Sequence, residues 1–141
     1  MTTRRPSPAG ILAEARFADL DAEFLLDLRG WLARSLRGWA PGLVRDVTVV
    51  LGELMTNAFR HAGPPFAARV SVASAGHALR VEVHDGSTVH LADWTFGRGL
   101  LVVRDLCRDW GVEHSARGKI TWAEVPVPLL SRPALPTSPL R

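Results

Sequence analysis

The amino-acid sequence predicts an α/β two-layer sandwich, in which a mixed, mostly antiparallel sheet is covered on one face by three helices. Two observations lead to this fold class. Apolar residues recur at helical spacing in three segments, and short runs of alternating apolar and polar residues stand between these segments. The alternating runs come in pairs joined by short turns, which favours antiparallel hairpins over a parallel βαβ nucleotide-binding fold.

Three segments have the spacing of amphipathic helices. The first follows Asp21, a suitable N-cap residue, and ends near Arg37–Gly38. The second begins at Pro41, which suits a first helical turn, and ends at the Gly63-Pro64-Pro65 signal. The third begins after Gly97-Arg98-Gly99. The expected apolar faces hold Phe24, Leu28, Trp31, Leu32 and Leu36 in the first helix, Val47, Val50, Leu51, Leu54 and Ala58 in the second, and Leu100, Val103, Leu106 and Cys107 in the third.

The alternating runs predict a first strand and two hairpins. The expected strands are Glu14–Phe17, Arg69–Ala73, Leu79–Asp85, Trp110–Ser115 and Lys119–Val125. Glycine-containing triplets at 75–77 and 116–118 supply the two hairpin turns, and residues 86–96 show no periodicity and are expected to form a loop.

The domain organisation predicted from composition is one folded unit over residues 11–125. A flexible tail is expected at 1–10 and a Pro-rich, disordered tail at 126–141. The hydrophobic fraction of 47% is sufficient for a core, and Cys107, as the single cysteine, excludes an internal disulfide. No signal peptide and no apolar run of the ~18 residues that span a membrane is found, so we expect a cytoplasmic protein with no membrane partner.

The charge pattern argues against a nucleic-acid partner. The formal net charge is +3, and Lys119 is the only lysine. The arginines are scattered from Arg4 to Arg141 among acidic residues and form no basic stripe. We therefore expect no specific nucleic-acid binding, and a steep salt dependence of DNA affinity would be the sign of the opposite.

The second helix carries a candidate metal and catalytic motif. Glu53, Asn57 and His61 stand four residues apart and therefore lie along one helix face. A carboxamide oxygen suits Mg²⁺, which takes few protein ligands beside phosphates and water. A solvent-facing polar helix surface has the same pattern, so this segment alone leaves both interpretations open.

Two further motifs follow along the chain. Asp85 continues an inward apolar alternation, where a carboxylate needs a partner, and with Gly86 it suits a hydrogen bond from the amino group of a planar ligand. Gly97-Arg98-Gly99 precedes a helix, whose first N–H groups favour phosphate oxygens. Taken singly, both motifs are weak signals, because an Asp-Gly turn is very common and a plain loop before a helix start is the more frequent explanation of a Gly-x-Gly stretch.

In their order and spacing, the three motifs resemble the N, G1 and G2 boxes of the Bergerat-fold ATPases, which include gyrase, histidine kinases and the bacterial anti-sigma-factor serine kinases. The Trp110-Gly111 pair and the stretch Gly118-Lys119-Ile-Thr-Trp122 look like the stand-alone anti-sigma kinase type. The resemblance covers roughly residues 12–125.

The resemblance implies a role for each motif residue. Asn57 would chelate the Mg²⁺ that bridges the ATP phosphates, and Glu53 would be the base or orienting group for the attacking hydroxyl. Asp85 would hold the adenine amino group, with Gly86 making room beside the base. The rest of the implied ATP site consists of Gly97, Arg98, Gly99 and Leu100, the first three of them along the phosphates, and His61 at the end of the N box.

The implied function is an ATP-binding protein serine/threonine kinase of the anti-sigma type. It would transfer the γ-phosphate to an anti-sigma-factor antagonist and would also bind a sigma factor, and homodimer formation stays open. Two features depart from the family pattern: Asp85 and Gly86 are adjacent, and only eleven residues, Gly86–Phe96, connect Asp85 to Gly97. This short lid favours an alternative, a non-catalytic ATP-dependent partner-binding module.

Overall fold

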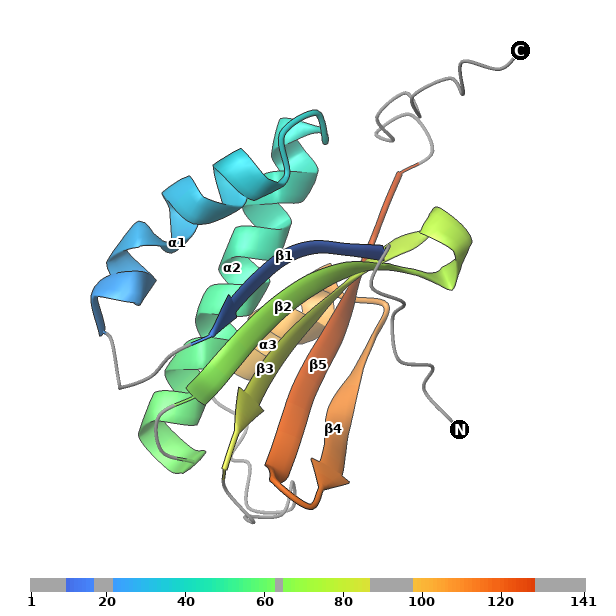
Figure 1. Cartoon of the computed structure of the whole chain (residues 1–141). Coiled ribbons are helices and arrows are strands. Elements are labelled where there is room, and N and C mark those ends of the chain that lie inside the picture. The colour runs from blue at the N-terminus through green and yellow to red at the C-terminus, as the bar shows by residue number, and fades with distance from the viewer. Residues whose placement is uncertain (1–9, 17–21, 63–64, 87–97, 129–141) are drawn as a thin grey trace.

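The computed structural model describes residues 10–16, 22–62, 65–86 and 98–128 (Figure 1). In chain order the elements are β1 (Ile11–Arg16), α1 (Ala22–Ser35), α2 (Pro41–Asn57), the π-helical turn η2 (Ala58–Ala62), β2 (Pro65–Ala73), the 3₁₀ turn η3 (Ser74–Gly76), β3 (Ala78–Asp85), α3 (Arg98–Leu106), β4 (Asp109–Ser115) and β5 (Gly118–Pro126). The predicted loop over 87–96 and most of both predicted tails lie outside the described residues.

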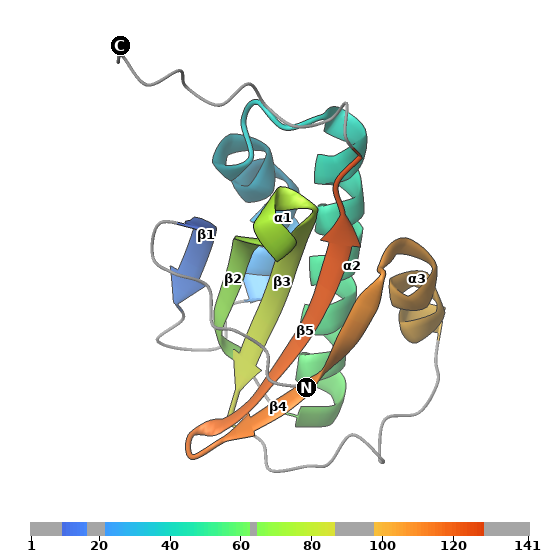
Figure 2. The same cartoon turned by 90° about the vertical axis from the view of Figure 1, so that its right-hand side faces the viewer.

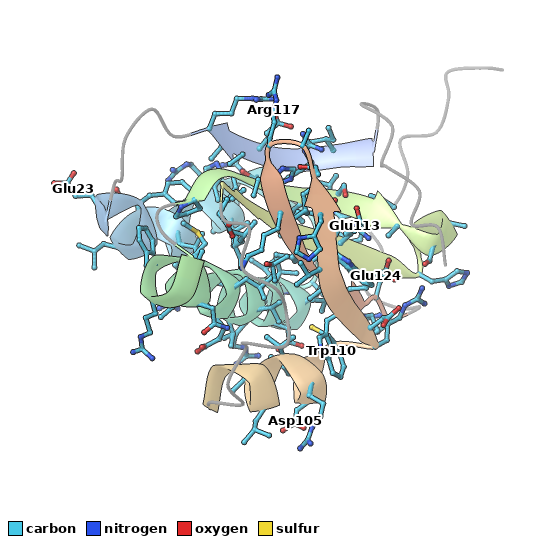
Figure 3. The ribbon with its side chains drawn as sticks, turned by 90° about the horizontal axis from the view of Figure 1, so that it is seen from below. Glu23, Asp105, Trp110, Glu113, Arg117 and Glu124 are labelled. Carbon is cyan, nitrogen blue, oxygen red and sulfur yellow. The ribbon has the colours of Figure 1, made fainter. Side chains whose placement is uncertain are left out.

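The strands form one sheet in the order β1-β2-β3-β5-β4. Each neighbouring pair is antiparallel, and both predicted hairpins are present. The helices pack on one side of this sheet (Figure 3). The predicted two-layer sandwich is therefore confirmed, with the second hairpin turned so that β5 lies beside β3 and β4 at the edge (Figure 2).

The central helix of the helical layer is α2, which contacts α1, α3, β3 and β5. Pro41 opens it, as expected from a residue whose missing N–H costs nothing in a first turn. Its fully buried side chains recur at helical spacing and meet the inner face of the sheet. The principal core residues are Leu32, Val47, Val50, Leu51, Leu54, Val70, Leu79, Val81, Val83, Val103 and Val125.

Several predicted boundaries shift in the structure. The strand β1 begins at Ile11, earlier than the predicted Glu14, and α3 begins at Arg98, before the predicted start after Gly99. The strand β2 begins at Pro65, earlier than the predicted Arg69, so it follows the helical layer almost directly. At the other end β5 runs to Pro126, and Val127 is buried with its amide donating to the His77 carbonyl at 2.8 Å. The ordered part of the chain therefore continues past Val125.

The middle strand β3 is buried on both faces. Its inner face contributes Leu79, Val81 and Val83 to the core. Its outer face, away from the helices, carries Arg80 and Glu82, which are only 4% and 3% exposed. Buried charges are unfavourable unless they are paired and hydrogen-bonded.

The outer-face charges satisfy one another in a connected network. Arg80 donates from Nε to Glu82 Oε2 at 2.7 Å and from Nη2 to Glu113 Oε1 at 2.9 Å. His84 Nε2 lies 2.9 Å from Glu82 Oε1, and the Arg80 guanidinium lies 4.5 Å from the ring centroid of Trp122. Trp122 is thus buried on the face opposite the helices, whereas Trp31 and Trp110, also predicted core residues, pack against the helix–sheet core.

This network lowers the pKa of Glu82. Burial alone would raise the pKa, but hydrogen bonds from His84 and Arg80 outweigh burial and hold the pKa below its ordinary value of 4.5.

Within the described ranges, no helix is both long and apolar enough to cross a membrane.

We expect Glu82→Gln to lower the free energy of unfolding by about 1–3 kcal/mol at neutral pH, because the buried Arg80 loses a charged partner. The folded-state pKa is depressed, so the contribution of the carboxylate is complete above its unfolded pKa and disappears as the pH falls through the folded value. The difference between wild type and variant should therefore shrink as the pH falls below the ordinary value of 4.5 and through the depressed folded value. Urea denaturation of both proteins at a series of pH values measures this difference in the free energy of unfolding.

Glu14→Gln is the matched control. Glu14 accepts a hydrogen bond from Arg69 Nε at 2.9 Å, but the pair lies at the exposed edge of the sheet. Glu14→Gln should therefore lower the free energy of unfolding by less than about 1 kcal/mol. Equal losses in the two variants would contradict a special role for the buried network.

Candidate functional site

The candidate site begins on one flank of α2. Glu53 and Asn57 are half-buried and lie beside the apolar stripe of this helix, as their spacing predicts. Asp46 precedes Glu53 by two helical turns and shares the same flank. A polar flank beside a buried stripe places these side chains at the margin of the core.

The flank with Glu53 and Asn57 faces α3. Burial, with a smaller contribution from the charge of Asp46, raises the pKa of the Cys107 thiol to about 12, so Asp46 lies close to the residue that follows α3. The two helices are also in contact. Cys107 is a buried free cysteine, which agrees with its place on the predicted apolar face.

The first turn of α3 consists of Arg98, Gly99 and Leu100, all implied ATP-site residues, of which Arg98 and Gly99 are implied to line the phosphates. The free N–H groups of a first helical turn attract anions, which is the property that the sequence analysis used. Gly97, the remaining member of this motif, lies outside the described residues.

Asp85 ends β3 with only 1% of its surface exposed. The sheet register places it opposite Pro65 at the start of β2 and opposite Lys119 at the start of β5. The π-helical turn η2, which contains His61, contacts both β2 and β3. The end of the α2 helix and the end of β3 therefore meet at one end of the molecule, together with the β4–β5 turn (Figures 1 and 2).

A glycine holds the β4–β5 turn against the end of β3. Gly118 has φ = 140°, and a Cβ atom there would lie 2.1 Å from the Asp85 carbonyl oxygen and 2.6 Å from Gly86 Cα. Gly86 differs, because a Cβ atom there would meet only the Arg117 carbonyl oxygen at 3.9 Å. Gly118 is thus required by packing, while Gly86 is exposed and leaves room beside Asp85.

The donor set fits a nucleotide with a bound Mg²⁺. Asp85 provides a buried acceptor for an amino group, and low polarity around it strengthens such a hydrogen bond. Asn57 would be the protein ligand to Mg²⁺, which commonly takes its remaining ligands from phosphates and water. Among the described residues, no group of three His, Cys, Asp or Glu side chains forms a metal site of its own.

The sequence analysis missed Lys119 and Thr121 as candidate site residues. The register places Lys119 opposite Asp85 and Thr121 opposite Val83, so both leave β5 on the inner face of the sheet. Thr121 is buried and Lys119 is half-buried. The stretch 118–122 carries part of the family resemblance, but no local signal places it beside Asp85, because the pairing of β3 with β5 joins segments separated by α3 and β4.

Comparison with known proteins identifies the family of this chain. A family model described as the histidine kinase-like ATPase domain matches residues 14–125, which is most of the chain. The protein therefore belongs to the histidine kinase-like ATPase domain family, and so to the Bergerat-fold ATPases whose boxes its motifs resemble. This membership supports ATP binding and, in general terms, ATP-dependent phosphotransfer.

The chain is similar to the histidine kinase domain from Erythrobacter litoralis EL346 blue-light activated histidine kinase, with 21% sequence identity and a TM-score of 0.49. The match covers 71% of this chain and 61% of that chain, so this chain spans less than two thirds of the length of that domain. No curated protein matches the sequence at a significant level.

We expect Gly118→Ala to disturb the site as well as the stability. The substitution forces a backbone conformation that costs about 1–3 kcal/mol in residues other than glycine, and it pushes the turn away from Asp85. Thermal unfolding measures the loss of stability, and nucleotide titration measures the effect on the site. Gly42→Ala in α2 is the control: a Cβ atom there lies 3.8 Å from the flexible end of Arg45, so this variant should be as stable as wild type or more stable. A Gly118→Ala protein of wild-type stability would contradict the packing argument.

Proposed function

We propose that this protein is an ATP-binding serine/threonine kinase of the anti-sigma type. The observation that carries the proposal is the placement of Asp85, a carboxylate buried at the end of the sheet where the α2 helix also ends. A buried acceptor there suits the amino group of adenine, and the Glu53–Asn57 flank faces the helix whose first turn would receive phosphates. Family membership supports the ATP part of the proposal.

The proposed reaction transfers the γ-phosphoryl group to a serine or threonine hydroxyl of a partner protein. The hydroxyl oxygen forms the new bond to phosphorus, the bond from phosphorus to the ADP oxygen breaks, and Glu53 orients the hydroxyl and takes up its proton. Asn57 would hold Mg²⁺, which neutralises phosphate charge when bound. Asp85 fixes the adenine end, so that the triphosphate extends toward α2 and α3.

The partners in this proposal are an anti-sigma-factor antagonist as the phosphate acceptor and a sigma factor as a second binding partner. They follow from the resemblance of the three boxes and of the stretch 118–122 to the anti-sigma kinases. A cytoplasmic location and a homodimer belong to the same proposal.

A second candidate function is an ATP-dependent binding module without phosphotransfer. The connection of eleven residues between Asp85 and Gly97 favours it, because a short lid excludes less water from the phosphates. In this case ATP would change the affinity for a partner and would leave the partner unmodified.

ATP binding is tested by calorimetric titration with and without Mg²⁺. We expect binding by wild type to require Mg²⁺ and to weaken about tenfold or more in both Asn57→Ala and Asp85→Asn, because each loses one charge-assisted or metal-mediated contact. Glu23→Ala on the exposed surface of α1 should bind as wild type. Absence of ATP binding by folded wild type would overturn the proposed function.

The kinase and the binding module are separated by Glu53→Ala. If Glu53 orients the attacking hydroxyl, this variant should retain ATP affinity within about threefold and lose at least about 100-fold in the rate of phosphate transfer. Radiolabelled transfer from ATP to a cognate antagonist measures the rate. Should wild type bind ATP and a partner but transfer no phosphate, the binding module would replace the kinase.

A further inference from the structure

Three polar residues form a row across the end of the sheet. Asp85 of β3 pairs with Lys119 of β5, and Lys119 pairs with His114 of β4. Residues directly opposite each other in antiparallel strands project to the same face, with Cβ atoms about 5 Å apart. The face is the helix side, because Val83 and Val81, at alternate positions before Asp85, belong to the core.

Lys119 has a fixed position in this row. The preceding Gly118 lies against the backbone of Asp85, in contact too close for any side chain. The turn before it is closed by Ser115, whose Oγ lies 3.5 Å from the Gly118 carbonyl oxygen and accepts from the Arg117 amide at 3.3 Å. The half-buried Lys119 therefore leaves a rigid part of the backbone beside the buried carboxylate.

A carboxylate and an ammonium group side by side offer an acceptor and a donor. Adenine shows the complementary pattern, because its exocyclic amino group is a donor and the ring nitrogens next to it are acceptors. If Asp85 receives the amino group, the neighbouring Lys119 is a cation from which a ring nitrogen could accept a hydrogen bond.

We propose that Lys119 is a second base-recognition residue, which donates to a ring nitrogen of adenine beside the amino group held by Asp85. This inference rests on the proposed ATP site and adds a specificity determinant to it. It makes recognition depend on two adjacent features of the base, where Asp85 alone would require only an amino group.

Titration of Lys119→Met with ATP, 1-deaza-ATP and 7-deaza-ATP tests this. Wild type should bind ATP about tenfold more tightly than the analogue that lacks the contacted nitrogen, as expected for one charge-assisted hydrogen bond. Lys119→Met should bind ATP about tenfold more weakly than wild type and should no longer distinguish ATP from that analogue.

Arg117→Met is the matched control. It removes the same charge from the same hairpin, but Arg117 is exposed at the turn and points away from the helices (Figure 3). It should bind all three nucleotides as wild type does. If Lys119→Met and Arg117→Met weaken ATP equally, the effect is one of overall charge and the inference is wrong.

A second measurement uses the fact that Lys119 is the only lysine. Reductive methylation of wild type, followed by mass spectrometry of the peptide, should be slower at Lys119 when ATP is present, with the N-terminal amine as internal reference. This readout does not depend on the folding of a variant. Unchanged methylation of Lys119 at saturating ATP would overturn the inference while ATP binding stands. Failure of wild type to bind ATP would overturn the proposed function as well, so the two failures are distinguishable.

Discussion

Burial of β3 on both faces is the constraint on which the rest of the structure depends. The strand must present apolar side chains to the helices, while the residues between them carry charge. The outer network around Arg80 and Glu82 meets this requirement by pairing each charge and covering Trp122. In the middle of the sheet, β3 ends at Asp85, which is buried as well. The outer face of the strand thus carries the charge network, and its inner face carries the candidate site.

The candidate site forms where three connections meet at one end of the sandwich. The π-helical turn carries the chain from α2 to β2, β3 ends beside the start of β2, and the second hairpin turns against the same point. A π-helical turn departs from regular hydrogen bonding and is frequent at functional sites. Here it lies between Asn57 and the strand that pairs with Asp85. These irregular backbone segments bring side chains from separate elements together.

Local periodicity predicts the parts of this site that depend on a single element. The alternation of β3 places Asp85 on the inner face, and the helical period places Glu53 and Asn57 on one flank, both without knowledge of the fold. Non-local packing decides the rest. The way in which α2 and α3 cross decides whether the Glu53–Asn57 flank faces α3. The pairing of β5 with β3, across an intervening helix and strand, decides that Lys119 is the neighbour of Asp85. The burial of Glu82 is equally hidden, because an alternating charge on a strand normally indicates a solvent-facing side.

The sheet and the helices contribute differently to the proposed chemistry. The base would be held by β3 and β5, whose ends are fixed by close backbone contact at Gly118. The phosphates and the attacking hydroxyl would be held by α2 and α3, which belong to the other layer. Loss of Glu53 would therefore remove transfer and leave the base-binding half intact. For the same reason, base binding by the sheet is compatible with both candidate functions, the kinase and the ATP-dependent binding module. The geometry of Glu53 and Asn57 relative to the first turn of α3 decides between these two functions, since phosphoryl transfer depends mainly on positioning and charge neutralisation.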